Sequence, residues 1–213
     1  MRKSARMGAD VTVRAAPARR RAGLLRKLLS ALALTLCAAA PARAGDQFSI
    51  EASSRGGAVV LHVQSHIRAR LPVIWGTLTD YDRLPQFVPS ITYSRVLERR
   101  GLAAVVEQKG AAQILFFSYP IEVTVESVES PPDSISVRVL KGNLKQLEGG
   151  YHVDKIAGAD NEYTLSWRGV IEPDFAVPAF INVPLMRASL KEQFLAMVKE
   201  IERRELLAVQ AGP

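Results

Sequence analysis

The end of the chain constrains the fold most, because residues 184–207 read as one long amphipathic helix. Its apolar stripe at helical spacing consists of Leu190, Phe194, Met197 and Ile201. Charged side chains such as Lys191 and Glu202 take the opposite face, so the apolar side must be buried against another element. We expect Asn182 to cap this helix and Pro184 to lie in its first turn, where the missing N–H needs no partner.

Most of the preceding chain reads as strands. Apolar alternation bounded by turn residues predicts strands at residues 59–67, 91–98, 102–109, 114–128, 134–140, 144–156 and 162–171. Two short helices should follow the first strand: Pro72 suits the first turn of one, and the other lies between Asp82 and Pro89. A long helix after a run of antiparallel strands predicts an α+β fold, in which a curved sheet of about seven strands closes over that helix.

The formal charge of +7 does not indicate a nucleic-acid partner, because it is concentrated at the N-terminus. Residues 1–44 hold ten of the 28 Lys and Arg residues and one of the 21 acidic residues, which leaves 18 basic and 20 acidic residues in the remainder. A phosphate-binding surface needs Lys and Arg gathered on one folded face. The remainder has no such cluster, so we expect no nucleic-acid binding.

The N-terminus has the pattern of a secretory signal. Basic residues precede an apolar run at residues 28–40, and Ala42 and Ala44 supply the small side chains that a signal peptidase reads. The run is shorter than the ~20 residues of a membrane span. We therefore expect a signal peptide at residues 1–44, export to the periplasm, and a single domain at residues 45–210. The alternative is an uncleaved leader that anchors the protein in the inner membrane.

The predicted order of elements resembles that of the helix-grip fold, and local motifs strengthen the likeness. These motifs are Tyr81 followed by Phe87-Val88-Pro89, Gly149-Gly150-Tyr151, and Thr164-Leu165 with Trp167. In these features residues 57–207 are similar to the START/Bet v1-like (SRPBCC) superfamily, in its polyketide cyclase/dehydrase and Coq10-like branch. The resemblance implies a helix-grip domain with a deep apolar cavity between the sheet and the last helix, used to bind lipids, quinones, sterols or polyketides.

Large apolar residues that would face such a cavity are spread over the whole domain. On the resemblance, the ligand-binding set is Trp75, Phe87, Phe117, Tyr119, Tyr151, Trp167, Phe175, Phe180, Phe194 and Met197. The alternative for each of them is a place in a solid core, where large apolar residues are usually found. Residues 172–184 contain three prolines and read as a stiff, apolar loop that serves as a gate or contacts a membrane.

Candidate catalytic residues are few. Glu107 and Tyr119 would serve as base or acid of a cyclase or dehydratase if they pointed into the cavity, where burial raises the pKa of a carboxyl group. The alternative for Glu107 is an exposed position on its strand. His62 and His66 share one predicted strand and lie about 13 Å apart, too far to bind one metal ion. Cys37 belongs to the leader, and we expect no metal and no cofactor.

Together these features predict an exported binding or transport protein for a hydrophobic ligand, a lipid or an isoprenoid quinone, held between the sheet and the C-terminal helix. Export favours a carrier over an enzyme, because ATP and nicotinamide cofactors are scarce outside the cytoplasm. Two alternatives stay open. One is a cyclase or dehydratase with an acid or base in the same cavity, and the other is a membrane-associated accessory protein that docks through residues 172–184.

Overall fold

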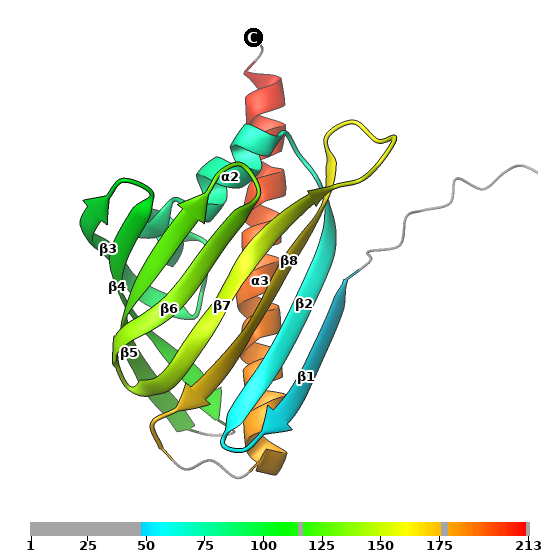
Figure 1. Cartoon of the computed structure of the whole chain (residues 1–213). Coiled ribbons are helices and arrows are strands. Elements are labelled where there is room, and N and C mark those ends of the chain that lie inside the picture. The colour runs from blue at the N-terminus through cyan, green and yellow to red at the C-terminus, as the bar shows by residue number, and fades with distance from the viewer. Residues whose placement is uncertain (1–47, 115–116, 176–178, 212–213) are drawn as a thin grey trace, which may run out of the picture. The chain divides into compact units, whose positions relative to one another are not determined.

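A curved antiparallel sheet of eight strands lies around one long helix in the computed structural model, which describes residues 48–114, 117–175 and 179–211 (Figure 1). In chain order the elements are β1 (Ser49–Arg55), β2 (Ala58–Arg68), α2 (Leu71–Leu78), the 3-10 helix η1 (Tyr81–Gln86), β3 (Ile91–Arg100), β4 (Ala103–Ile114), β5 (Phe117–Ser130), β6 (Ser134–Gly142), β7 (Leu144–Lys155), β8 (Glu162–Pro173) and α3 (Ala179–Gln210). The expected α+β helix-grip fold is confirmed. The leader at residues 1–44 lies outside the described residues and stays a prediction.

The sheet has one strand more than the sequence pattern predicts. Its strand order is β1-β2-β8-β7-β6-β5-β4-β3, so the additional strand, β1, forms one edge. In β1 only Ile50 and Ala52 are partly buried and the other side chains are exposed, so its apolar alternation is too short to be recognised. Gly56, at φ +63°, adopts the left-handed conformation of the tight turn that pairs β1 with β2.

Helix α3 begins earlier than the sequence indicates. It starts at Ala179, so Asn182 lies inside the helix rather than at its cap, and Pro184 lies beyond the first turn. Asn182 is 4% exposed, and its Nδ2 donates a hydrogen bond of 3.3 Å to the Gly57 carbonyl oxygen in the turn between β1 and β2. A tertiary contact therefore holds this first turn against the sheet, which local capping signals do not reveal.

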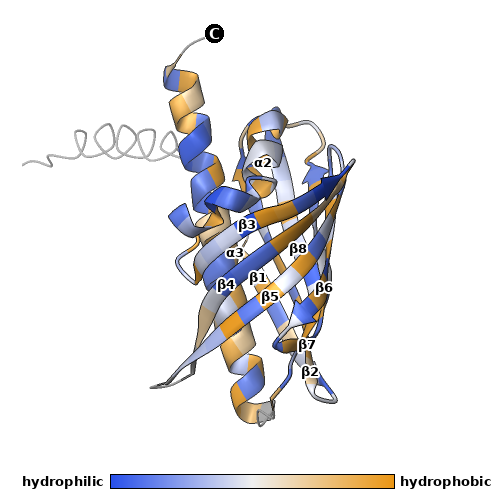
Figure 2. Ribbon diagram, turned by 90° about the vertical axis from the view of Figure 1, so that its left-hand side faces the viewer, coloured by the Kyte–Doolittle hydropathy of each residue, from blue (hydrophilic) through white to orange (hydrophobic). Residues whose placement is uncertain are grey.

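The core lies between the concave face of the sheet and the apolar stripe of α3. The four stripe residues predicted from the sequence, Leu190, Phe194, Met197 and Ile201, are all buried. Opposite them, alternate residues of β2 are also buried: Val59, Leu61, Val63 and Ile67. Figure 2 shows apolar and polar residues alternating along the strands, the pattern of a sheet with one buried face. Among the described residues no helix has both the length and the hydropathy of a membrane span.

Ion pairs hold η1 against the C-terminal half of α3. Arg204 lies 2.9 Å from Asp80 at the start of η1 and 2.7 Å from Glu200 on its own helix. Arg203 also binds Glu200, at 2.6 Å. Glu200 is 7% exposed, and the hydrogen bonds from Arg203 and Arg204 lower the pKa of its carboxyl group to about 2, although burial by itself would raise it.

Candidate functional site

A cavity of about 150 Å³ lies between the concave face of the sheet and α3. Its apolar lining consists of two alanines, Ala111 and Ala112, and the larger residues Ile91, Ile121, Val123, Leu144, Leu147, Ile171 and Met186. The period of two along each strand sets this orientation. On β5, for example, Ile121 and Val123 line the cavity, whereas the side chain of Glu122 between them is 64% exposed.

Uncharged polar groups form the side of the cavity that lies toward β3 and β4. They belong to Ser90, Gln108, Ser189 and Gln193. Gln193 Nε2 donates a hydrogen bond of 3.2 Å to Ser189 Oγ, whereas Ser90 Oγ is buried without a partner among the described residues. Lys109 also borders the cavity, but its Nζ lies 3.7 Å from Glu122 and 3.9 Å from Glu107, so its charge is directed to the outer face. The cavity therefore has one apolar side and one polar, uncharged side.

The polar side of the cavity opens into a surface groove of about 290 Å³. Ser90, Ala111 and Ser189 line both spaces, so only small side chains are shared between the cavity and the groove. Figure 2 looks onto β3, β4 and α3, which surround it. A Cβ atom at Gly110 would overlap the Ser90 carbonyl oxygen, so glycine at this position lets the segment before β3 approach β4 closely.

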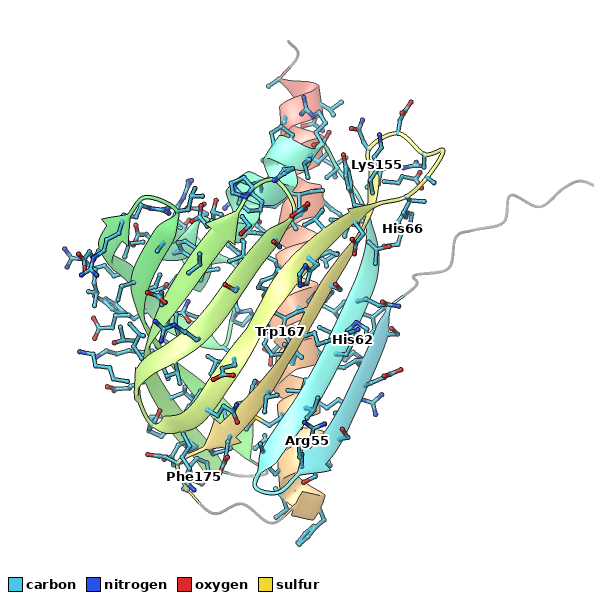
Figure 3. All side chains as sticks on the ribbon, in the orientation of Figure 1. Arg55, His62, His66, Lys155, Trp167 and Phe175 are labelled. Atoms are coloured by element: carbon cyan, nitrogen blue, oxygen red, sulfur yellow. The ribbon has the colours of Figure 1, made fainter. Side chains whose placement is uncertain are left out.

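Trp167 (Figure 3) is buried on the concave face, as expected from the sequence. The next residue, Arg168, is exposed on the other face. The indole lies against two glycines that pair across β7 and β8: a Cβ atom would be 2.8 Å from Trp167 Cζ2 at Gly149 and 2.6 Å from Cη2 at Gly169. Tyr151 pairs with Trp167 on the same face, and burial raises the pKa of its hydroxyl to about 12. The glycines thus let a large ring lie flat on the sheet beneath α3.

Phe175 lies where β8 leads toward α3 (Figure 3), and its ring contacts that of Tyr119, with centroids 3.9 Å apart. The Tyr119 hydroxyl donates a hydrogen bond of 3.4 Å to Asp174, and partial burial together with this carboxylate raises its pKa. The expected loop at residues 172–184 is wrong in its extent, because β8 and α3 take up most of it. Phe180 consequently lies in the first turn of α3, where it is 79% exposed.

Glu107 lies on the outer face of the sheet. Its neighbour Val106 is fully buried on the concave face, whereas the Glu107 side chain is 35% exposed and lies 3.9 Å from Lys109 Nζ. The sequence left both orientations open for this carboxylate. The structure favours the exposed one, which does not reach the cavity.

The histidines do not gather into a site. His62 and His66 both lie on β2 (Figure 3), and His66 Nε2 is 3.1 Å from a Glu162 carboxylate oxygen. His152, on β7, is exposed. Within residues 48–114, 117–175 and 179–211, no three His, Cys, Asp or Glu side chains are placed to share a metal ion.

Glu129 is a buried acid that the sequence pattern does not reveal. It is 7% exposed on β5 and accepts hydrogen bonds from Tyr81 at 3.2 Å and from Arg99 at 2.9 Å. Burial, and then the charge of Glu129, raise the pKa of the Tyr81 hydroxyl. Glu129 borders neither the cavity nor the groove, so its partners indicate a structural role in fixing η1 to the sheet.

The described cavity is not lined by the aromatic residues predicted for it. Trp167, Phe194 and Met197 are buried in the core, and Trp75, Phe87 and Tyr151 pack against it partly buried. The Phe117 side chain lies outside the described residues. Contact of a ligand with any of the ten residues predicted from the sequence stays a prediction. The residues that do line the cavity are mostly aliphatic side chains, Ser and Gln, and their signal in the sequence is alternation with exposed positions.

Comparison with known proteins identifies the family. The family model described as polyketide cyclase / dehydrase and lipid transport matches residues 67–198, more than half of the chain. The chain belongs to this family. The match runs from the end of β2 into α3 and includes every residue that lines the cavity. No curated protein matches the chain.

Solved structures of this and related families share the fold. The Zhui aromatase/cyclase from a Streptomyces species has a TM-score of 0.58 at 12% identity, covering 77% of this chain and 99% of that one. A STAR-related lipid transfer protein from Xanthomonas axonopodis has a TM-score of 0.53 at 12% identity, covering 72% and 98%. A START superfamily protein from Mycobacterium smegmatis has a TM-score of 0.52 at 16% identity, covering 70% and 98%. Identities this low show that the fold is shared and leave the ligand open.

Proposed function

We propose that this protein is an exported carrier of a hydrophobic molecule, a lipid or an isoprenoid quinone, held between the sheet and α3. The observation that carries the proposal is the composition of the cavity lining. Nine of its residues are apolar, seven large side chains and two alanines, and the polar ones that face inward are Ser and Gln. Apolar contact with a few placed polar groups is typical of ligand binding.

The dimensions support partial enclosure of an elongated ligand. A cavity of about 150 Å³ accepts a group the size of a benzene ring. Whole ligand pockets usually measure roughly 300–1,000 Å³, so the remainder of the molecule would lie in the adjoining groove of about 290 Å³. Apolar contact contributes about 25 cal/mol per Å² before the costs of association are subtracted.

The proposed route to the ligand is export through the leader at residues 1–44, with the periplasm as destination. A carrier there would take an insoluble molecule through water between membranes. Contact with a membrane surface belongs to the same proposal, because Phe180 in the first turn of α3 is 79% exposed and next to the connection from β8.

An enzymatic function has one observation in its favour. The Tyr119 hydroxyl has a carboxylate partner, Asp174, at 3.4 Å, and a tyrosine can take part in proton transfer, although the raised pKa of this hydroxyl makes it a weaker acid. However, neither Tyr119 nor Glu107 borders the described cavity. For this reason we place the carrier first and a cyclase or dehydratase second.

Mass spectrometry of an organic extract tests the carrier function directly. The protein would be purified without detergent from the compartment to which the full chain delivers it, and we expect one lipid or quinone in stoichiometric amount. Ala111→Phe should exclude it, because Ala111 lines both the cavity and the groove. Ala157→Phe, in an exposed turn, is the matched control. An empty wild-type protein that turns over a polyketide substrate would favour the enzyme instead.

A further inference from the structure

We infer that the ligand is a neutral amphipathic molecule whose carbonyl or hydroxyl group is bound by Ser90, Gln108 and Gln193. This inference rests on the proposed carrier function and names its ligand class. All three residues line the cavity, and Ser90 also lines the groove, while Leu147 and Ile171 belong to the apolar side. A molecule with one polar end and an apolar remainder matches both sides at once.

Two buried hydroxyls lack partners, one in the lining of the polar side and one on the strand next to it. Ser90 Oγ and Ser94 Oγ are both buried and make no hydrogen bond within the described part of the chain. Ser94 is 7% exposed and pairs in register with Gln108, so its hydroxyl lies on the same face as the Gln108 amide. Buried polar groups nearly always have a partner in the functional state, because an unsatisfied one lowers stability.

These groups suit a ligand group that can accept and donate hydrogen bonds. A serine hydroxyl does both, and the carboxamide of Gln108 carries a carbonyl acceptor and an amide donor. Gln193 is already oriented by its hydrogen bond to Ser189, at 3.2 Å, and lies on α3 facing the same side of the cavity. A quinone carbonyl would accept hydrogen bonds from these residues, and an alcohol would also donate a hydrogen bond to them.

The charges around the cavity argue against an anionic head group. Lys109 is paired on the outer face with Glu107 and Glu122, at 3.9 Å and 3.7 Å. Of the described residues that line the groove, Glu192 is the one that carries a charge, and that charge is negative. A phosphate or carboxylate would lose its hydration here without gaining a cation. Isoprenoid quinones, sterols and long-chain alcohols satisfy the site, whereas phospholipids and fatty acids do not.

Binding of two molecules with the same chain length tests the inference. The probes are 1-decanol, which is neutral, and decanoate, measured by calorimetry in mildly alkaline buffer where the carboxylate is ionised. We expect decanol to bind at least tenfold more tightly. Ser90→Ala and Gln108→Leu should each weaken decanol binding roughly three- to tenfold, as for loss of one hydrogen bond. Gln64→Leu, on the outer face of β2, is the matched control and should change nothing.

A structural role for Ser90 predicts a different pattern. If its hydroxyl supports only the fold, Ser90→Ala lowers the melting temperature and leaves the ratio of decanol to decanoate binding unchanged. We expect the reverse, a melting temperature that is unchanged or higher together with a smaller ratio. Equal or tighter binding of decanoate would overturn the ligand class and leave the carrier function standing. No binding of either probe would overturn both.

Discussion

Replacing Gly149 by Ala tests how the sheet makes room beneath α3. The added Cβ atom would lie 2.6 Å from the Arg168 carbonyl oxygen, 2.8 Å from Trp167 Cζ2 and 2.9 Å from Gly169 Cα. Two of these three atoms belong to the backbone of β8, so a side-chain rotation does not relieve the overlap. Overpacking of this kind costs typically 1–3 kcal/mol. A loss of that size would lower the melting temperature by roughly 3–10 °C in a domain of this length.

Urea denaturation of the variant and of a matched control measures the effect. The control is Gly76→Ala, on the exposed side of α2, where an added Cβ atom meets nothing within 4 Å. There the same substitution should stabilise the protein by up to about 1 kcal/mol, because Ala is the better helix former. The reasoning is refuted if Gly149→Ala unfolds at the wild-type urea concentration, or if both variants shift in the same direction.

Three further predictions concern charge, core and surface. Glu200→Gln should lower the free energy of unfolding at neutral pH by roughly 2 kcal/mol, since the carboxylate has a pKa of about 2 in the folded state against 4.5 ordinarily. This contribution is complete above pH 4.5 and is lost as the pH falls toward 2. The free energies of unfolding of the two proteins, measured as a function of pH, should therefore converge near pH 2, and a constant difference between them would contradict the prediction. Phe194→Ala, at a position with 0% exposure, should lower the free energy of unfolding measured in urea by about 3–5 kcal/mol. A loss below about 1 kcal/mol would exclude tight packing around Phe194. Phe180→Ser should reduce cosedimentation with liposomes; the control is Leu206→Ser, at the other end of α3, where the side chain is also exposed. Identical binding of the two variants would remove the membrane contact.

Regular elements with a strong local period were predictable from the sequence. The stripe of α3 and the buried alternation of β2 are each set by side chains that recur at the period of one element. The turn between β3 and β4 also depends on one residue, Gly101, whose positive φ of 58° suits glycine. Burial in such elements follows from the pattern alone, because only one face carries apolar residues.

Elements that depend on a distant partner were missed or misplaced. β1 has a weak apolar pattern and exists because β2 pairs with it over its whole length. The first turn of α3 depends on the hydrogen bond from Asn182 to the Gly57 carbonyl oxygen. Neither contact leaves a periodic signal, since the partner lies far away in the sequence.

For the site, the sequence by itself determined the family likeness and therefore the expectation of a cavity between sheet and helix. It did not determine which residues line that cavity. Large aromatic side chains such as Trp167 and Phe194 were natural candidates, but their volume fills the core. The tertiary structure instead leaves space beside Leu147, Gln108 and other modest side chains. Whether space remains at a position depends on the volumes of all its neighbours together, and these meet only when the sheet curves around α3.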